Sequence, residues 1–211
     1  LSKRRREYRT TYGYGQSRTP RKVISRRGSR FIFIGAGAPQ TVGGRRAHPP
    51  KSWKIRQENI NDKERRKALR SAIAATAIKN IVAMRGHRLE GIKETPIILE
   101  DKIELQSKSK NVEEILEKLG LGTEIERASI SKLRSGKGKM RGRTYKRKRS
   151  VLFVVSKRCD LLKSARNIAG ADVVHVKDLN AELLAPGSHA GRLTIWSESA
   201  IKMLAEKKMF M

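Results

Sequence analysis

The sequence predicts an α/β protein with a mostly parallel sheet and flanking helices, joined to a long, basic, extended loop. Two observations support this fold class. From about residue 95, short apolar runs typical of strands alternate with amphipathic stretches typical of helices. Residues 1–50, in contrast, hold 13 Lys or Arg, a single acidic residue and no lasting amphipathic period. We therefore expect an extended basic loop that reaches into RNA over residues 1–52 and a globular RNA-binding domain over residues 53–211.

The charge balance indicates the kind of partner. The 211 residues include 49 Lys or Arg and 20 Asp or Glu, a formal net charge of +29. Acidic substrates or lipid would also feel such a field, but a polyanion with regularly spaced phosphates fits it best. No apolar run approaches the roughly 18 residues of a membrane span, so we expect no membrane partner.

The first residues and the cysteine and histidine content argue against a signal peptide, an intramolecular disulfide and a metal site. Basic residues at the start are followed by no apolar region, so no signal peptide is expected. Because the chain starts at Leu1 in a charged stretch, we expect further residues before it in the natural protein. One cysteine allows no intramolecular disulfide, and the four histidines lack the spacing of metal ligands.

The segment before residue 53 mixes arginines with aromatic residues and glycines. Alone in water it buries too little apolar surface to offset its ordering entropy. Arginines on phosphates and rings against bases or sugars would order it on nucleic acid, whereas the alternative is a disordered linker. The cations that we expect to contact RNA here are Arg4, Arg5, Arg6, Arg9, Arg18, Arg21, Lys22, Arg45 and Arg46.

The first predicted helix covers residues 59–87. Asn61 and Glu64 form a capping pair, and Gly86 ends the helix. Its first turns carry Arg65 and Arg66, cations that oppose the helix dipole, so we expect an external anion beside them; a solvated face is the alternative. The apolar stripe is expected at Leu69, Ala72, Ile73, Thr76, Ala77, Ile81 and Met84.

Strands and helices then alternate in a Rossmann-like, three-layer pattern. The run over residues 150–156 is apolar throughout, which is typical of a strand buried on both faces. The other strands are expected at residues 95–101, 173–176 and 192–196. Helices are expected at residues 111–120, with Asn111 as its cap, 160–170, with Asp160 as its cap, 179–187 and 197–208.

A basic, glycine-rich insertion lies within this pattern, at residues 131–149. Of the 18 residues from Lys132, ten are Lys or Arg and none is acidic. Such a block repels itself and needs an anionic partner to become ordered. The alternative, a solvated tail, is disfavoured because the block lies between foldable segments rather than at an end of the chain. The expected RNA contacts here are Lys137, Lys139, Arg141, Arg143, Lys146 and Arg147.

Several motifs suggest an enzyme and fail on inspection. The glycines at Gly35 and Gly37 start a dinucleotide fingerprint, but Gln40 replaces the third glycine and no helix pattern follows. The stretch "SGKGKM" lacks the first glycine and the Ser or Thr of a phosphate-binding loop. Cys159, at a helix start, would have a lowered pKa there, although a packing role is favoured. We expect no catalytic, cofactor-binding or metal-binding residue.

Four stretches carry a family resemblance: "KALRSAIAATA…AMRGHRLEG", "LRSGKGKMRGR", "NIAGADVVHVKDLN" and "LAPGSHAGRLTIWSESAIKML". They resemble the archaeal and eukaryotic branch of the large-subunit ribosomal protein L four family. The resemblance covers nearly all of residues 53–210, and residues 1–52 resemble the long internal loop of the family. It also implies that the family's N-terminal strands and first helix are missing from this chain.

The resemblance implies a function and partners. The domain would bind large-subunit ribosomal RNA beside neighbouring ribosomal proteins in the cytoplasm, with no homo-oligomer. The loop, which at about 3.3 Å per residue reaches roughly 80 Å, would line the peptide exit tunnel and meet the nascent peptide. From their central position we take Arg26, Arg27, Arg30, Phe31 and Phe33 as tip candidates.

Two other classes compete with this reading. A different basic nucleic-acid protein, either an architectural binder or a nuclease, shares the charge, but a nuclease needs clustered acids for metal ions. A nucleotide-dependent enzyme on a Rossmann-like sheet needs the glycine fingerprint that fails here.

Overall fold

The computed structural model describes residues 7, 8, 15, 17–207, 209 and 210, the first two by their backbone alone. The predicted RNA contacts Arg4, Arg5, Arg6 and Arg9 lie outside the described residues. The chain divides into two compact units, Leu1–Glu58 and Asn59–Met211, which are described separately.

The first unit is built on an antiparallel hairpin. Strand β2 (Arg21–Arg27) pairs with β3 (Arg30–Gly35), and the short β1 (Glu7–Tyr8) pairs with the other side of β2. Gly28, with φ +59°, opens the two-residue connection, where glycine relieves the steric cost of a positive φ. After β3 the chain forms two successive turns, closed by Thr41 N–H to Ala38 O and by Gly44 N–H to Thr41 O. Because turns rather than a helix follow β3, the structure agrees with the rejection of a dinucleotide-binding motif at this position.

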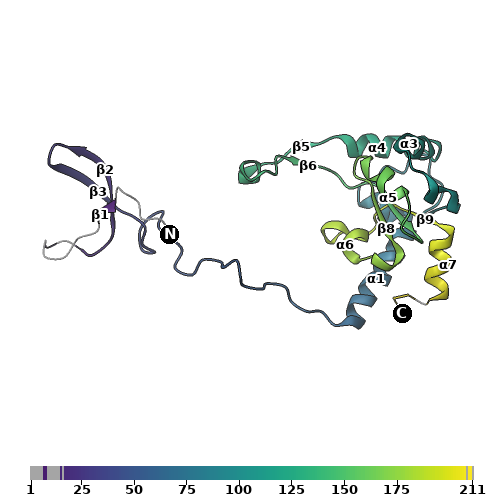
Figure 1. Cartoon of the computed structure of the whole chain (residues 1–211), viewed down its shortest axis with the longest axis horizontal. Coiled ribbons are helices and arrows are strands. Elements are labelled where there is room, and N and C mark those ends of the chain that lie inside the picture. The colour runs from purple at the N-terminus through teal and green to yellow at the C-terminus, as the bar shows by residue number, and fades with distance from the viewer. Residues whose placement is uncertain (1–6, 9–14, 16, 208, 211) are drawn as a thin grey trace. The chain divides into compact units, whose positions relative to one another are not determined.

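The second unit contains a four-stranded parallel sheet, two strands of which are labelled in Figure 1. The strand order is β4-β9-β7-β8. The central strands are β7 (Leu152–Val155) and β9 (Thr194–Ser197), and the edges are β4 (Ile97–Leu99) and β8 (Asp172–His175). Every residue of β7 and β9 is buried. The predicted apolar strand and the predicted mostly parallel sheet are therefore confirmed.

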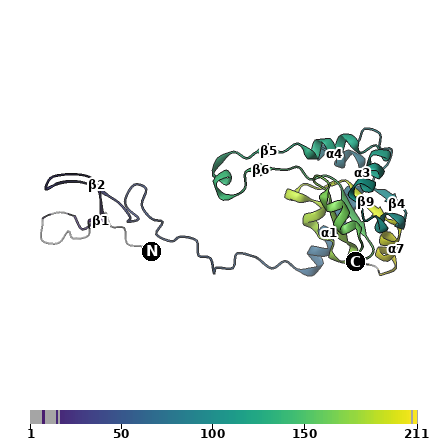
Figure 2. The ribbon, with the colours of Figure 1, turned by 45° about the horizontal axis from the view of Figure 1, so that its top comes forward.

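Helices cover both faces of this sheet and complete three layers (Figure 2). One core joins Phe153 and Ile195 to Leu116 of α3 (Ser109–Lys118). The other joins Val154 and Trp196 to side chains of α1 and α7. Successive strand residues enter opposite cores because side chains alternate along a strand. The helices of the second core are α1 (Asp62–Ala77), α6 (Ala181–Leu184) and α7 (Glu198–Glu206).

The predicted helix over residues 59–87 is two helices, α1 and α2 (Lys79–Met84), because the chain leaves helical geometry at Ile78 (φ −96°, ψ 105°). The break has a packing reason. Leu69 of α1 belongs to one core and Val82 of α2 to the other, so the chain passes from one face of the sheet to the opposite one. The continuous apolar stripe was therefore wrong in its later part: Ala77 and Met84 are exposed.

Three residues predicted to cap helices make no capping hydrogen bond with their side chains. Asn61 stands at the N-cap of α1 but its side chain makes no capping hydrogen bond. Asn111 lies inside α3, which begins at Ser109, and donates instead to Gln106 at 3.2 Å. Asp160 stands at the N-cap of the short helix α5 (Leu161–Ser164), as predicted, but it has helical backbone angles and its side chain makes no capping hydrogen bond.

The remaining elements are short, apart from the unpredicted helix α4 (Gly122–Ser129). Strands β5 (Lys132–Leu133) and β6 (Tyr145–Lys146) pair antiparallel within the basic insertion. The 3-10 helices are η1 (Asp101–Leu105), η2 (Gly136–Arg141), η3 (Ala165–Asn167), η4 (Val176–Asp178) and η5 (Pro186–Ser188).

Candidate nucleic-acid interface

The basic insertion forms an arm that projects from the second unit, and we call residues 131–149 the basic arm (Figures 1 and 2). β5 and β6 form its two sides and η2 its end. Arg134 ties the sides together, because its backbone N–H donates to Thr144 O at 2.8 Å and its guanidinium donates to Arg143 O at 3.1 Å. Gly142, with φ +75°, makes the return turn.

The cations predicted on this arm all point into solvent. Among the described residues none of the six makes a side-chain hydrogen bond or ion pair. An ordered backbone therefore carries unneutralised charge, which is the property of a surface that contacts phosphates. These exposed residues are Lys137, Lys139, Arg141, Arg143, Lys146 and Arg147.

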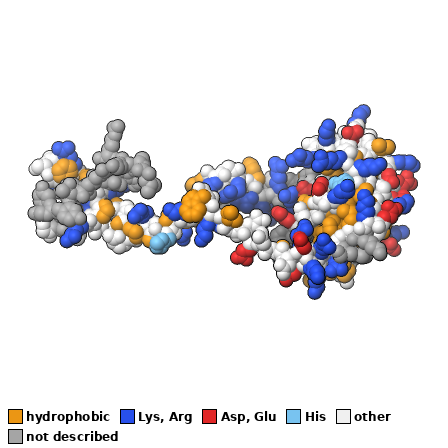
Figure 3. Space-filling view, turned by 60° about the horizontal axis from the view of Figure 1, so that its bottom comes forward, with side chains coloured by type: hydrophobic (Ala, Val, Ile, Leu, Met, Phe, Trp, Pro, Cys, Tyr) orange, Lys and Arg blue, Asp and Glu red, His pale blue; other side chains and the backbone are white. Residues whose placement is uncertain are grey.

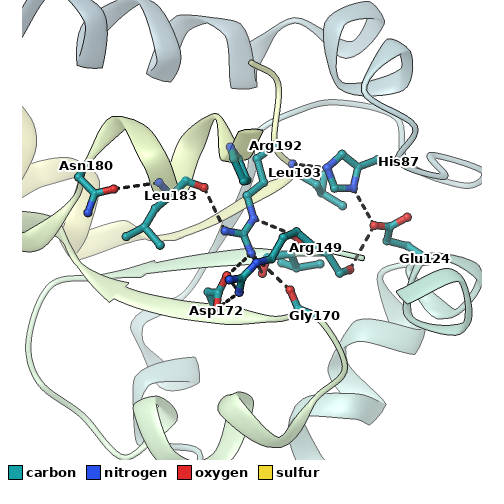
Figure 4. Close-up of polar contacts among 12 residues, drawn as sticks. His87, Glu124, Arg149, Gly170, Asp172, Asn180, Leu183, Arg192 and Leu193 are labelled. Atoms are coloured by element: carbon teal, nitrogen blue, oxygen red, sulfur yellow. Dashed lines mark hydrogen bonds and ion pairs between the residues drawn. The ribbon is translucent and has the colours of Figure 1, made fainter. Parts of the chain in front are cut away.

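A buried polar network holds the base of the arm (Figure 4). Its centre is Glu124 of α4, whose side chain is fully buried. Arg127 donates to both carboxylate oxygens of Glu124, at 2.6 and 2.7 Å, and also to Arg149 O at 2.9 Å. The Ser150 hydroxyl donates to Glu124 at 3.2 Å. The carboxylate thus joins the helix before the arm to the residue after it.

His87 closes the network on the other side of Glu124. Its Nδ1 lies 2.6 Å from Glu124 Oε1, and its Nε2 lies 3.3 Å from the backbone N–H of Leu193. The tautomer with the proton on Nδ1 satisfies both contacts, because Nδ1 then donates and Nε2 accepts. The backbone N–H of Arg88 donates to the second carboxylate oxygen at 2.9 Å.

These contacts determine the acidity of Glu124. Burial alone would raise the pKa of this carboxyl group, because it disfavours the charged form. Hydrogen bonds from Arg127, His87 and the Arg88 N–H outweigh burial and lower the pKa from 4.5 to about 2. The carboxylate is therefore a stable anion at neutral pH.

A second buried cation lies at the start of β9. Arg192 is 1% exposed and donates to Ser150 O at 2.9 Å, to Leu183 O at 3.0 Å and to Asp172 at 2.6 Å (Figure 4). Burial lowers the pKa of Arg192, while Asp172 opposes that shift. Asp172 also accepts two bonds from Arg149, both at 2.9 Å. Together these residues fix the end of the arm to β7 and β8.

Sequence reasoning missed this network. His87, Glu124, Asp172 and Arg192 are far apart in the sequence and match no catalytic or metal-binding motif. A signal exists only for Asp172 and Arg192, each of which directly precedes an apolar run, "DVV" and "RLTIW".

The predicted RNA-contact residues on α1, Arg65 and Arg66, do not lie beside the basic arm. The N-terminal end of α1 lies on the other side of the unit from the arm (Figure 1). Arg65 is exposed and pairs with Asp62 at 3.2 Å, and Arg66 is exposed as well. Lys and Arg side chains are mixed with acidic ones over the compact part of this unit (Figure 3). The basic arm, which contains no acidic residue, is the more distinct cationic feature.

The hairpin of the first unit presents aromatic and basic side chains together. Phe31 and Phe33 stack with centroids 6.0 Å apart and planes 9° from parallel. The Arg26 guanidinium lies 5.2 Å from the Phe31 centroid, a cation–π contact. Of the other predicted residues in this unit, Arg21 is half-buried and donates to Ser17 O at 2.8 Å. The exposed ones are Arg18, Lys22, Arg27, Arg30, Arg45 and Arg46.

The carboxyl ends of the parallel strands, where open α/β sheets bind ligands, are closed by a carboxylate. Buried Glu104 accepts from Ser156 N–H at 2.8 Å, from the Ser156 hydroxyl at 3.1 Å and from the Ser197 hydroxyl at 2.7 Å. A carboxylate at this position repels a phosphate. Burial raises the pKa of the nearby Cys159 thiol, contrary to the alternative of a lowered pKa. In the described part of the chain no group of His, Cys, Asp or Glu could hold a metal ion.

No helix among the described residues has both the length and the apolar character needed to cross a membrane.

The fold and its surface define a basic α/β protein whose ordered arm is suited to hold a polyanion. The model of the Ribosomal protein L4/L1 family matches residues 1–207. The chain therefore belongs to this family, as the sequence resemblance predicted. Members of the family are structural rather than catalytic, which confirms the expectation that the chain is not an enzyme.

Individual relatives agree. The large ribosomal subunit protein uL4 of Archaeoglobus fulgidus is 48% identical over 195 residues, which cover 92% of this chain and 74% of the relative. That of Nanoarchaeum equitans is 46% identical over 210 residues, 99% of this chain and 77% of the relative. That of Methanocaldococcus jannaschii is 51% identical over 173 residues, 82% of this chain and 68% of the relative.

Proposed function

We propose that this chain is a structural constituent of the large ribosomal subunit and binds large-subunit ribosomal RNA. The family assignment and the names of the relatives support the subunit. The observation that carries RNA binding is the basic arm, whose ordered backbone holds six exposed cations without a carboxylate partner among the described residues. RNA phosphates would supply the missing negative charge.

We extend the proposal to the first unit as a loop that enters the RNA and lines the peptide exit tunnel. Of its described residues only Ala38 is buried, so the hairpin has almost no core of its own. Small hairpins are marginally stable in water, and walls of RNA around this one would supply the missing contacts. The stack of Arg26, Phe31 and Phe33 would then face a base or the nascent peptide. Neighbouring ribosomal proteins complete the surroundings, in the cytoplasm.

RNA selectivity tests the first proposal. The purified chain is bound to a large-subunit ribosomal RNA transcript and, separately, to duplex DNA at the same physiological salt concentration. We expect affinity for the transcript to be at least about tenfold higher, because specific binding exceeds non-specific binding by more than charge alone provides. Equal affinities would favour a general nucleic-acid binder and contradict the ribosomal function.

Cross-linking tests the second proposal. A photoreactive phenylalanine analogue replaces Phe31 in ribosomes that carry a stalled nascent peptide, and the same analogue at exposed Ala205 of α7 is the control. We expect a cross-link to the nascent peptide at position 31 and none at position 205. Absence of the cross-link at position 31 in assembled ribosomes would refute the tunnel placement while leaving RNA binding untouched.

A further inference from the structure

A groove lies where the basic arm leaves the second unit, and we call it the arm-base groove. Its volume is about 930 Å³. Helix α2 forms one wall, the turn Pro186–Ala190 forms the second, and the two strands of the arm, next to Ile130 and Arg149, form the third. Three segments that are distant in the sequence therefore converge on one hollow.

Apolar side chains line part of this groove and remain open to solvent. Met84 of α2 is 87% exposed and Ile130 is 54% exposed, and Ile81 and Pro186 lie beside them. Exposed apolar groups collected in a hollow are typical of a binding surface. A partner with phosphates alone would leave these groups in water.

Cations line much of the remainder, and the described residues that line the groove include no acidic one. Arg127 and Arg149 also lie in the wall, but carboxylates already neutralise them. The five lysines and arginines without an ion pair among the described residues are Arg85, Lys132, Lys146, Arg147 and Lys148. The groove therefore combines an apolar surface with strong positive charge.

The groove is held in shape by its own contacts. Arg85 donates to His189 O at 2.6 Å and to Pro186 O at 3.1 Å, which joins α2 to the turn. Burial lowers the pKa of Arg85, and the positive charge of Arg127 lowers it further, so an anion in the groove would relieve a crowded cationic site. Gly191 lies so close to α2 that a Cβ there would meet Ile81 O at 2.8 Å. These contacts hold the walls formed by α2 and by the turn against each other without a ligand, which reduces the entropy cost of binding.

We propose that the arm-base groove binds an unpaired nucleotide of the RNA, with its base against Met84 and Ile130 and its phosphates on the surrounding cations. This inference rests on the proposed RNA binding and adds the site and the form of the RNA. An A-form duplex hides its bases and is recognised mainly through its backbone and minor groove. A splayed-out nucleotide, in contrast, offers an apolar ring face together with phosphates. The volume also falls within the range of about 300–1,000 Å³ typical of pockets for small ligands.

Filling the groove tests this proposal without removing any charge. Ala190 is exposed and lines the groove, so Ala190→Trp blocks it while sparing the core. Ala205→Trp, at an exposed site on α7, is the matched control. We expect Ala190→Trp to weaken binding to a large-subunit ribosomal RNA transcript about tenfold or more, the loss of one stacked base. The salt dependence of binding should stay unchanged, because no cation is lost. Ala205→Trp should bind within about twofold of the original chain.

The outcomes separate the two proposals. If the unmodified chain does not bind the transcript, RNA binding itself fails. If the chain binds and Ala190→Trp binds equally well, RNA binding stands and the groove proposal is wrong. Circular dichroism must show that both variants remain folded. Should Ala190→Trp unfold the chain, Met84→Ser, at an exposed position, replaces it with the same expected loss of affinity.

Cross-linking identifies the form of the RNA. A transcript that contains 4-thiouridine is bound to the full chain, irradiated and digested, and the linked peptides and nucleotides are sequenced. We expect a link between an unpaired uridine and a peptide with Met84 or the turn 186–190. Links from this groove only to base-paired nucleotides, or links confined to the end of the arm at 136–143, would overturn the proposal.

Discussion

Replacing Glu124 with glutamine removes the one charge at the centre of the network that anchors the basic arm. Glutamine has nearly the same shape, but it leaves Arg127 without its carboxylate, at hydrogen bonds of 2.6 and 2.7 Å. Breaking a buried ion pair in this way costs about 3–5 kcal/mol. We therefore expect Glu124→Gln to lower the free energy of unfolding at neutral pH by roughly 3 kcal/mol.

The pH dependence supplies an independent magnitude. The pKa of Glu124 falls from 4.5 to about 2 in the folded state, and each unit corresponds to about 1.4 kcal/mol. Because the folded pKa is depressed, its contribution of roughly 3 kcal/mol is fully present above the unfolded pKa and disappears as pH falls through the folded pKa. The gap between the original chain and Glu124→Gln should shrink by about 2 kcal/mol between pH 7 and pH 3.

Urea unfolding, followed by circular dichroism and by the fluorescence of buried Trp196, measures this gap at each pH. The matched control is Glu126→Gln, at an exposed position on the same helix, which should change stability by no more than about 0.5 kcal/mol. Comparison with the control cancels the titration of other groups. A gap below about 1 kcal/mol at pH 7, or one that stays constant down to pH 3, would refute this account of the network.

Three further predictions concern the fold. Gly191→Ala should destabilise the chain by about 1–3 kcal/mol in thermal unfolding, because the φ of Gly191 is +90° and a Cβ there would clash with α2. Gly86→Ala is the control, since Gly86 has a φ of +95° but open space around it, and it should cost less stability. Equal losses of stability in the two variants would contradict the close contact of Gly191 with α2. Arg192→Lys should cost about 3 kcal/mol in urea unfolding, because lysine cannot replace the branched guanidinium contacts; a change below about 1 kcal/mol would show that the arginine is dispensable. Deletion of residues 10–45 should leave the melting temperature of the second unit unchanged, because both cores lie outside the deletion; a lower melting temperature would disprove this division.

The sheet was predictable because the pattern that indicates each strand lies within a few consecutive residues. The run from Val151 to Val155 is apolar without interruption, and a strand buried on both faces requires that pattern. The basic arm was predictable as a surface feature for a similar reason, since ten cations in 18 residues repel one another and cannot form a core. That these cations meet a partner of opposite charge stays a prediction.

The network at the base of the arm was not predictable because its information is non-local. Glu124 meets Ser150, 26 residues away, and His87, 37 residues away. The break at Ile78 is similar: helical propensity continues through it, and only the transfer from one core to the other explains it. Helix α4 was missed because Gly120 precedes it, Gly122 is its first residue, and its short sequence holds few apolar residues.

The salt dependence of RNA binding measures the central claim most directly. Affinity for a large-subunit ribosomal RNA transcript is measured from low to high salt for the original chain and for a variant with alanine at four positions of the arm, Lys137, Lys139, Arg141 and Arg143. Each phosphate contact contributes about 0.7–0.9 to the slope of log affinity against log salt concentration. We predict that the variant loses about 3 from that slope and keeps its circular dichroism spectrum. An unchanged slope in a folded variant would contradict the claim that the basic arm binds RNA phosphates.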